Sequence, residues 1–278
     1  MRRMFVVHST AVVDSMSGHK GSAKTQYPAV DEYATGDPYG VTEASRFHQR
    51  RLQFTIEAMR GTAGLLLDVG CGLGHFTAKF ARTHDAVGID LSSHALSFAG
   101  TRYQEPEFVC ADALTLPFRA PSFDVVVCNN IVEHVDSPGN LLRECHRVLK
   151  RGGFLIVSTP NWMRLQNRLL VVLGREPTRV HPSHVKEFTF SEMKGLITAT
   201  GFEVLDGLSW PEYPAMTMRK GVRHLANAVM QSMLILAFNA VGSPRLNNTI
   251  IYKCKKMADS LPEQDDSLHR NERGRNRG

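Results

Sequence analysis

Two carboxylates that close short apolar runs are the residues in this chain best suited to holding a polar ligand. Asp90 ends the run 86–90, and Asp112 ends the run 108–112. A carboxylate can accept hydrogen bonds from two neighbouring hydroxyl groups, so Asp90 could bind a ribose. Asp112 could accept a hydrogen bond from the amino group of an adenine. The chemistry that this spacing indicates is recognition of a nucleoside.

A turn with three alternating glycines precedes both carboxylates. Gly70, Gly72 and Gly74 lie between an apolar run that predicts a strand over 65–69 and apolar residues at helical spacing over 75–82. Glycine has no Cβ atom, so it allows a tight turn and a close approach to a ligand. The start of the helix also offers unpaired N–H groups. The pattern is that of a strand, a nucleotide-binding turn and a helix.

Two other residues of this turn admit more than one interpretation. Asp68 could contact the ligand or could hold the glycine turn through its backbone N–H groups. Cys71 lies inside the turn, where a cysteine is more often a small packed residue than a nucleophile. We therefore expect both residues to line the ligand site and expect no covalent role for Cys71.

Two histidines are candidates for a general base. His134 follows the predicted fourth strand, and His184 ends a basic, proline-broken loop. Open α/β sheets bind ligands beyond the carboxyl ends of their strands, and histidine can take the proton of a hydroxyl group. Two alternatives remain open for His134: together with Glu133 it could begin the next helix, or it could contact the backbone of the ligand.

The same loop contains an HxxH pair, His181 and His184. Such a pair can bind a metal when a helix or a further ligand brings the two rings together. Neither a nearby cysteine nor an added carboxylate pattern supports this here. The sequence predicts no metal site.

Alternating strands and helices must position these residues, and they predict a doubly wound, mostly parallel sheet. The all-apolar segment 125–127 needs cover on both faces, as helices on a parallel sheet provide. Asp124, at the start of that strand, is expected to be structural. The predicted strands are 65–69, 86–90, 107–110, 124–128, 154–159, 202–208 and 249–254, and the predicted helices are 42–59, 75–82, one from Ser92 or Ser93, 138–148, 162–173 and one from Ser191 or Glu192 to Gly201.

Length and composition fit a single α/β domain with terminal extensions. The chain has 278 residues, of which 42% are hydrophobic, and a net charge of +6 that is concentrated towards its ends. We predict a disordered or loosely packed extension over 1–38, a main domain over 39–256 with a helical insertion at 210–245, and a disordered polar tail over 257–278. Five cysteines without CxxC spacing favour a reduced, cytoplasmic protein.

As an ordered set, these motifs resemble those of the class I S-adenosylmethionine-dependent methyltransferases, in the small-molecule branch. The segments that carry the resemblance are 68–74, 88–90, 111–113, 122–127, 132–135 and 147–153. The resemblance implies a Rossmann-like sheet of seven strands with an antiparallel edge hairpin, with S-adenosyl-L-methionine as cofactor and S-adenosyl-L-homocysteine as product. The resemblance also places His184 in the pocket for the methyl acceptor, as a base or as a ligand of the acceptor. The cofactor contacts that it implies are Asp68, Gly70, Cys71, Gly72, Gly74, Asp90, Leu91, Asp112, Ala113 and Asn129.

The acceptor is expected to be a small molecule that offers a hydroxyl oxygen. An uncharged segment rich in large apolar residues within 211–244, together with 169–173, favours a hydrophobic or amphiphilic molecule such as a lipid, a quinone-like or polyketide-like compound, or a glycolipid sugar. Peripheral contact with a membrane is consistent with this pattern, whereas no segment is apolar enough to span one. Nucleic acid is disfavoured because 129–132 lacks the Asn/Asp-Pro-Pro-aromatic motif of base-methylating enzymes.

Two other function classes compete with methyl transfer. An NAD(P)-dependent oxidoreductase is disfavoured because the turn reads GxGxG instead of GxGxxG, because of Asp112, and because no Tyr-x-x-x-Lys pair lies near the fourth or fifth strand. A non-catalytic scaffold that keeps the cofactor fold would need a damaged cofactor site. The glycines and carboxylates are all present, which favours an enzyme.

Overall fold

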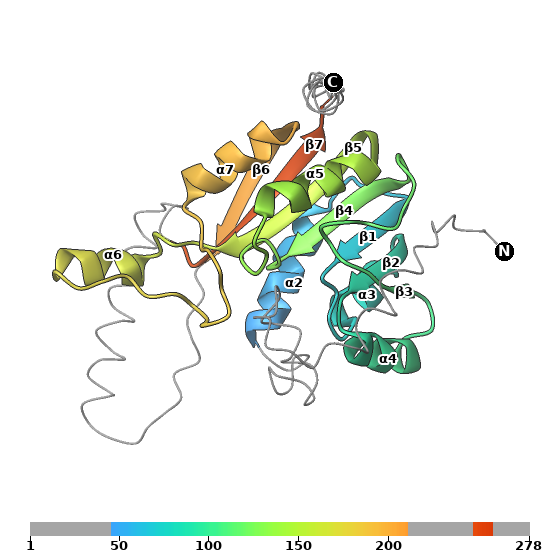
Figure 1. The fold of residues 1–278 in the computed structure, drawn as a ribbon, viewed down its shortest axis with the longest axis horizontal. Helices are drawn as coiled ribbons and strands as arrows, with labels where there is room; N and C mark the ends of the chain where they lie inside the picture. The colour runs from blue at the N-terminus through green and yellow to red at the C-terminus, as the bar shows by residue number, and fades with distance from the viewer. Residues whose placement is uncertain (1–45, 211–246, 258–278) are drawn as a thin grey trace, which may run out of the picture.

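The computed structural model describes residues 46–210 and 247–257, and its centre is a sheet of seven strands in the order β3-β2-β1-β4-β5-β7-β6 (Figure 1). Strands β1 to β5 run parallel, and β7 runs antiparallel to both β5 and β6. The predicted mostly parallel sheet with an antiparallel edge hairpin is confirmed. The strands are β1 (Leu65–Val69), β2 (Asp85–Asp90), β3 (Glu107–Cys110), β4 (Phe123–Asn129), β5 (Leu149–Pro160), β6 (Phe202–Trp210) and β7 (Thr249–Lys256).

Helices cover both faces of the sheet because its central strands are apolar on both sides. Along β1, Leu67 and Val69 belong to one apolar core and Leu66 belongs to the other, as the alternation of side chains in a strand requires. The first core is closed by α5 and α7, and the second by α2 and α3. The helices are α2 (Arg46–Ala58), α3 (His75–Phe80), α4 (Ser93–Arg102), α5 (Pro138–Val148), α6 (Leu165–Val172) and α7 (Phe190–Ala199).

Several predicted boundaries are corrected. The helix expected from Ser191 or Glu192 is α7, which begins earlier because Thr189 and Glu192 form a reciprocal capping box. The sixth strand continues to Trp210, the first residue of the expected insertion. The expectations for 1–38, for the rest of the insertion and for the tail beyond Met257 lie outside the described residues.

The register of the sheet brings the carboxyl ends of its central strands to one edge. Val69 at the end of β1 pairs with Ile89 on one side and Cys128 on the other. Asn129 at the end of β4 pairs with Ser158 of β5. The turns that follow these strands therefore meet at the same edge, which is where a parallel sheet binds ligands.

Helix α6 projects away from the sheet (Figure 1). Its carboxyl end leaves three large apolar side chains exposed, with Val171 53%, Val172 81% and Leu173 70% accessible. The helix is shorter than the predicted 162–173, and these residues do not contribute to either core. Among the helices of the described part of the chain, none is long and apolar enough to cross a membrane.

Candidate functional site

The glycine turn between β1 and α3 has the conformation that its sequence predicted. Gly70, Gly72 and Gly74 have φ angles of 72°, 51° and 73°, in the left-handed region that favours glycine. A Cβ atom on Gly70 would lie 2.7 Å from the side chain of Ile131, and one on Gly74 would lie 2.7 Å from the ring of Phe108. The turn is closely packed from outside, so only glycine fits at these two positions.

We expect Gly74→Ala to lower the free energy of unfolding by about 2–4 kcal/mol, because the new Cβ combines a strained φ with a clash against a ring. Urea denaturation followed by circular dichroism measures this. Gly100→Ala is the matched control: Gly100 lies within α4, and its added Cβ would meet no atom within 4 Å. A loss of stability equal in both variants would contradict the role of the turn.

Asp90 connects the glycine turn to the start of α4. Its Oδ2 accepts a hydrogen bond from the Gly72 N–H at 2.8 Å, and its Oδ1 accepts one from the Ser92 N–H at 2.9 Å. Burial raises the pKa of Asp90, and the backbone N–H groups oppose the shift by stabilising the charged form. Each oxygen keeps a lone pair for a further donor, as binding of two ribose hydroxyls would require.

Asp68 is held by a side chain and not by the backbone of the turn. It is 2% exposed, and its Oδ2 accepts a hydrogen bond of 2.6 Å from the Thr77 hydroxyl of α3. Of the two roles left open for Asp68, hydrogen bonding to the backbone N–H groups of the turn is not observed among the described residues. Burial raises the pKa of Asp68 to about 7, against the opposing effects of the Thr77 hydrogen bond and the charge of Arg51.

A small cavity of about 60 Å³ opens beside the turn. Asn129 lies on its wall, where its Oδ1 accepts hydrogen bonds from the hydroxyls of Thr55 and Ser158, both at 3.1 Å. The buried Nδ2 of Asn129 has no hydrogen-bond partner among the described residues, so it can donate to a ligand. The lining residues are Arg51, Asp68, Gly70, Cys71, Leu73, His75, Phe76 and Asn129.

The remaining predicted cofactor contacts lie just beyond the carboxyl ends of β2 and β3. The Ala111 N–H donates to the backbone oxygen of Asp90 at 3.1 Å, which brings Asp112 next to the end of β2. Asp112 accepts a hydrogen bond from the Leu114 N–H at 2.8 Å. Leu91 and Ala113 each follow one of these carboxylates along the chain.

The thiol of Cys71 fits the predicted packed role. Burial, followed by the nearby charges of Asp68 and Asp90, raises its pKa well above the usual range. A raised thiol pKa leaves less of the nucleophilic thiolate at neutral pH. The glycine cradle, the Asp90 carboxylate and the unsatisfied amide of Asn129 together suit a nucleoside with a polar tail, which is the shape of S-adenosylmethionine.

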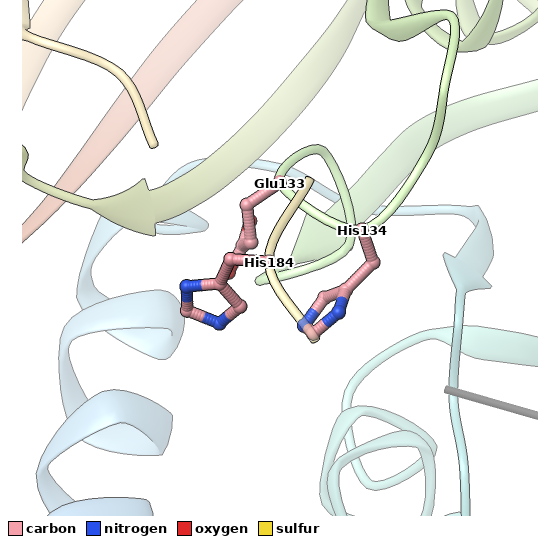
Figure 2. A group of neighbouring side chains, drawn as sticks. All are labelled: Glu133, His134 and His184. Carbon is pink, nitrogen blue, oxygen red and sulfur yellow. The ribbon is translucent and has the colours of Figure 1, made fainter. Parts of the chain in front are cut away.

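A second group of side chains lies beside the turn: Glu133, His134 and His184 (Figure 2). One ligand atom from each residue lies within 4.8 Å of the others. The rings of His134 and His184 are 4.8 Å apart and nearly perpendicular, at 86°. Residues from the turn after β4 and from the loop before α7 therefore meet in one cluster, which we call the His/Glu cluster.

A backbone contact brings the two segments together. The Val185 N–H donates to the backbone oxygen of Glu133 at 2.8 Å. Glu133 and His134 lie in a turn and do not begin the next helix, which starts at Pro138, so that alternative is wrong. The side chain of Ile131, two residues before Glu133, packs against Gly70, so the segment that carries Glu133 and His134 passes the glycine turn.

Glu133 is the most unusual member of the cluster. It is 0% exposed, and neither carboxylate oxygen has a hydrogen-bond partner among the described residues. Burial raises its pKa to about 7, while the charge of His184 opposes the shift. A buried carboxylate without hydrogen bonds is costly, so it indicates a binding role more than a structural one.

His184 is oriented by a buried network. Its Nδ1 lies 2.8 Å from Oε1 of Glu187, and Oε2 of Glu187 accepts a hydrogen bond of 2.8 Å from the Arg164 guanidinium. These contacts lower the pKa of Glu187 despite its burial. A carboxylate on Nδ1 sets the tautomer of the ring and directs Nε2 to the other side.

His134 and His184, the two candidate bases, differ in their surroundings. Burial, with the neighbouring rings of His184 and His181, lowers the pKa of His134 to about 4, which makes it a weak base. His134 has one hydrogen bond on Nδ1, a long contact of 3.4 Å with the Ser183 hydroxyl. His181, by contrast, is 5.9 Å from the His184 ring at a tilted angle. No local spacing in the sequence predicts the contact between Arg164 and Glu187, because the two residues are 23 positions apart.

Comparisons with known proteins agree with this geometry. Residues 67–157 match a family model described as a methyltransferase domain. A probable S-adenosylmethionine-dependent methyltransferase of Mycobacterium tuberculosis is 32% identical over 184 residues, which cover 65% of each chain. A ubiquinone biosynthesis O-methyltransferase of Ralstonia nicotianae is 35% identical over 175 residues, which cover 57% of this chain and 71% of that protein. The chain thus spans slightly less than two thirds of the mycobacterial relative.

Solved structures share the fold at low sequence identity. An N-methyltransferase of Bradyrhizobium japonicum in complex with S-adenosyl-L-homocysteine has a TM-score of 0.55 at 13% identity, covering 83% of this chain and 98% of that one. A [4+2]-cyclase has a TM-score of 0.53 at 20% identity, covering 77% of this chain and 85% of that one. Since the fold also serves a cyclase, the reaction must be argued from the site.

Proposed function

Because this chain belongs to the class I S-adenosylmethionine-dependent methyltransferases, we propose that it transfers a methyl group to a hydroxyl oxygen of a small-molecule acceptor. The observation that carries the proposal is the buried His184, oriented by Glu187, in a cluster that adjoins the glycine turn. A hydroxyl nucleophile benefits from a proton acceptor at this position.

Different residues would bind the methyl donor and the methyl acceptor. S-adenosylmethionine supplies an electrophilic methyl group on a positively charged sulfur. Asp90, Asn129 and the glycine turn would hold the donor, and the His/Glu cluster would receive the acceptor hydroxyl. Holding the two reacting groups in line accounts for much of the rate in such a reaction. His184, through the ring nitrogen opposite Glu187, would then take the hydroxyl proton.

An amphiphilic acceptor is supported by the surface of α6. The exposed Val171, Val172 and Leu173 lie beside two exposed arginines, Arg168 and Arg175. Apolar side chains with flanking positive charge suit contact with an anionic membrane surface or with an amphiphilic molecule. The name of the Ralstonia relative points to a quinone-type acceptor for that protein. We propose that the acceptor of this chain is also a lipid-like or quinone-like hydroxyl compound. The protein would then work in the cytoplasm with peripheral membrane contact.

The proposal is tested by acceptor-dependent release of S-adenosylhomocysteine from a panel of hydroxylated quinone precursors and lipids. We expect His184→Ala to lower turnover by about 100-fold, because general-base catalysis contributes at least that factor. Affinity for S-adenosylmethionine should change less than about twofold, since the cofactor residues are untouched.

His181→Ala is the matched control in the same loop, because His181 lies outside the His/Glu cluster. It should keep most of the wild-type turnover. No acceptor-dependent product with wild type across the panel would count against a hydroxyl acceptor of this class. Equal turnover in His184→Ala and wild type would remove His184 as the proton acceptor.

A further inference from the structure

We propose that Glu133, His134 and His184 form a binding site for one divalent cation of the zinc class (Figure 2). Two imidazoles and one carboxylate are a ligand set that binds zinc in proteins and leaves a coordination position open. One ligand atom of each residue lies within 4.8 Å of the other two. Ligand atoms around a tetrahedral zinc lie roughly 3.4 Å apart, so small side-chain rotations would close the set around an ion.

The carboxylate of Glu133 supplies an independent reason for a cation. It is fully buried, and both of its oxygens lack a hydrogen-bond partner among the described residues. An unpaired charge in a protein interior is strongly unfavourable, and a bound cation removes that cost.

The surroundings of His184 match those of a metal-binding histidine. Metal-bound histidines commonly donate the other ring N–H to a carboxylate, which fixes the ring and its tautomer. Here Nδ1 of His184 lies 2.8 Å from Glu187, and Glu187 is itself held by Arg164. The ring nitrogen left for a metal is Nε2. The backbone hydrogen bond from Val185 to Glu133 keeps the two ligand segments together.

The pairing of His134 with His184 differs from the HxxH pair that the sequence contains. The HxxH pair combines His181 with His184, but the ring of His134 lies closer to His184 than the ring of His181 does, at 4.8 Å against 5.9 Å. The expectation of no metal was drawn from the HxxH pair alone. The ligand set that we infer joins residues from two different segments.

The inference deepens the proposed function and rests on it for its catalytic consequence. A cation held by Glu133, His134 and His184 would polarise the acceptor hydroxyl and lower its pKa. The hydroxyl proton would pass to water, and the new O–CH3 bond would form as the S–CH3 bond of the donor breaks, with S-adenosylhomocysteine as the leaving group. In that state His184 is a ligand, and the proton does not go to its ring.

Binding can be measured without cofactor or acceptor. Tag-free full-length protein, treated with a chelator and dialysed, is titrated with Zn²⁺ by calorimetry and with Co²⁺ by visible absorption. We expect one equivalent of either ion and the absorption of four- or five-coordinate cobalt. His184→Ala and Glu133→Gln should each weaken binding by about tenfold or more, in line with the loss of a ligand. His181→Ala should bind like wild type.

Three results would overturn the site: no stoichiometric binding of either ion, equal affinity in wild type and in both ligand variants, or loss of binding in His181→Ala alone. Circular dichroism and binding of S-adenosylmethionine establish that each variant is folded. The two proposals fail separately. If the chelator-treated enzyme has full turnover and added Zn²⁺ does not change that turnover, methyl transfer stands and the metal site is excluded. If the protein binds Zn²⁺ but turns over no hydroxyl acceptor, the metal site stands and the acceptor class is excluded.

Discussion

Asp90→Ala is expected to weaken binding of S-adenosylmethionine by about 100-fold or more. A carboxylate that accepts two ribose hydroxyls makes two charge-assisted hydrogen bonds, each contributing roughly 1.5–3 kcal/mol. The substitution also removes the acceptor for the N–H groups of Gly72 and Ser92, so the glycine turn loses its link to α4. Both effects act in the same direction.

A thermal-shift titration measures this affinity. A ligand at 100 times its dissociation constant adds about 2.7 kcal/mol to the free energy of unfolding, which raises the midpoint by several degrees. Wild type should shift with S-adenosylmethionine and S-adenosylhomocysteine and not with NAD or NADP. Asp85→Ala is the matched control, because Asp85 lies at the opposite end of the same strand. Equal affinity in Asp90→Ala and wild type would remove the assignment of this carboxylate.

Asp68→Asn is expected to stabilise the unliganded protein at pH 8 by about 2–4 kcal/mol. Burial raises the pKa of Asp68 from 3.8 to about 7, so the folded protein binds this proton more tightly than the unfolded chain does. Wild-type stability therefore falls, relative to the asparagine variant, as the pH rises from about 4 to about 7. Asparagine keeps an oxygen that accepts the hydrogen bond from Thr77 and carries no charge to bury.

Urea denaturation at pH 5 and at pH 8 tests this directly. The advantage of Asp68→Asn should be larger at pH 8, where the buried wild-type carboxylate is ionised. Asp85→Asn, on an exposed carboxylate of the same sheet, is the matched control. A difference between wild type and Asp68→Asn that stays constant over this range would show that the carboxylate is not kept protonated by burial.

Local sequence was sufficient to predict the conformation of the glycine turn and the position of Asp90. Gly70, Gly72 and Gly74 are required by the backbone angles of one turn, and the structure has these angles. Asp90 ends an apolar strand, so its place at the sheet edge follows from the strand itself. Ser92 caps α4 by accepting the Ala95 N–H at 3.2 Å, as one of the two predicted caps. These features depend on neighbours in sequence, which is why pattern and spacing could predict them.

Boundaries were less predictable where side chains compete for backbone groups. Helix α7 begins after Thr189 because that hydroxyl and Glu192 satisfy each other's backbone N–H groups. Ser191 has the right residue type for a cap but lies inside the first turn. The apolar stripe of 162–173 predicted a helix, but pattern alone could not tell that Val172 and Leu173 face solvent.

What the sequence by itself determined is the order of strands and helices, the glycine turn and the carboxylates that follow the strands, because each depends on residues within one unit of the sheet. Only the tertiary structure decided the His/Glu cluster. His134 and His184 meet because a loop returns to the carboxyl edge of β4, and Glu187 reaches Arg164 across 23 residues. Asn129 meets Thr55 across 74 residues. Such contacts arise from the packing of distant segments against one sheet edge, and no local spacing encodes which ring will lie beside which carboxylate.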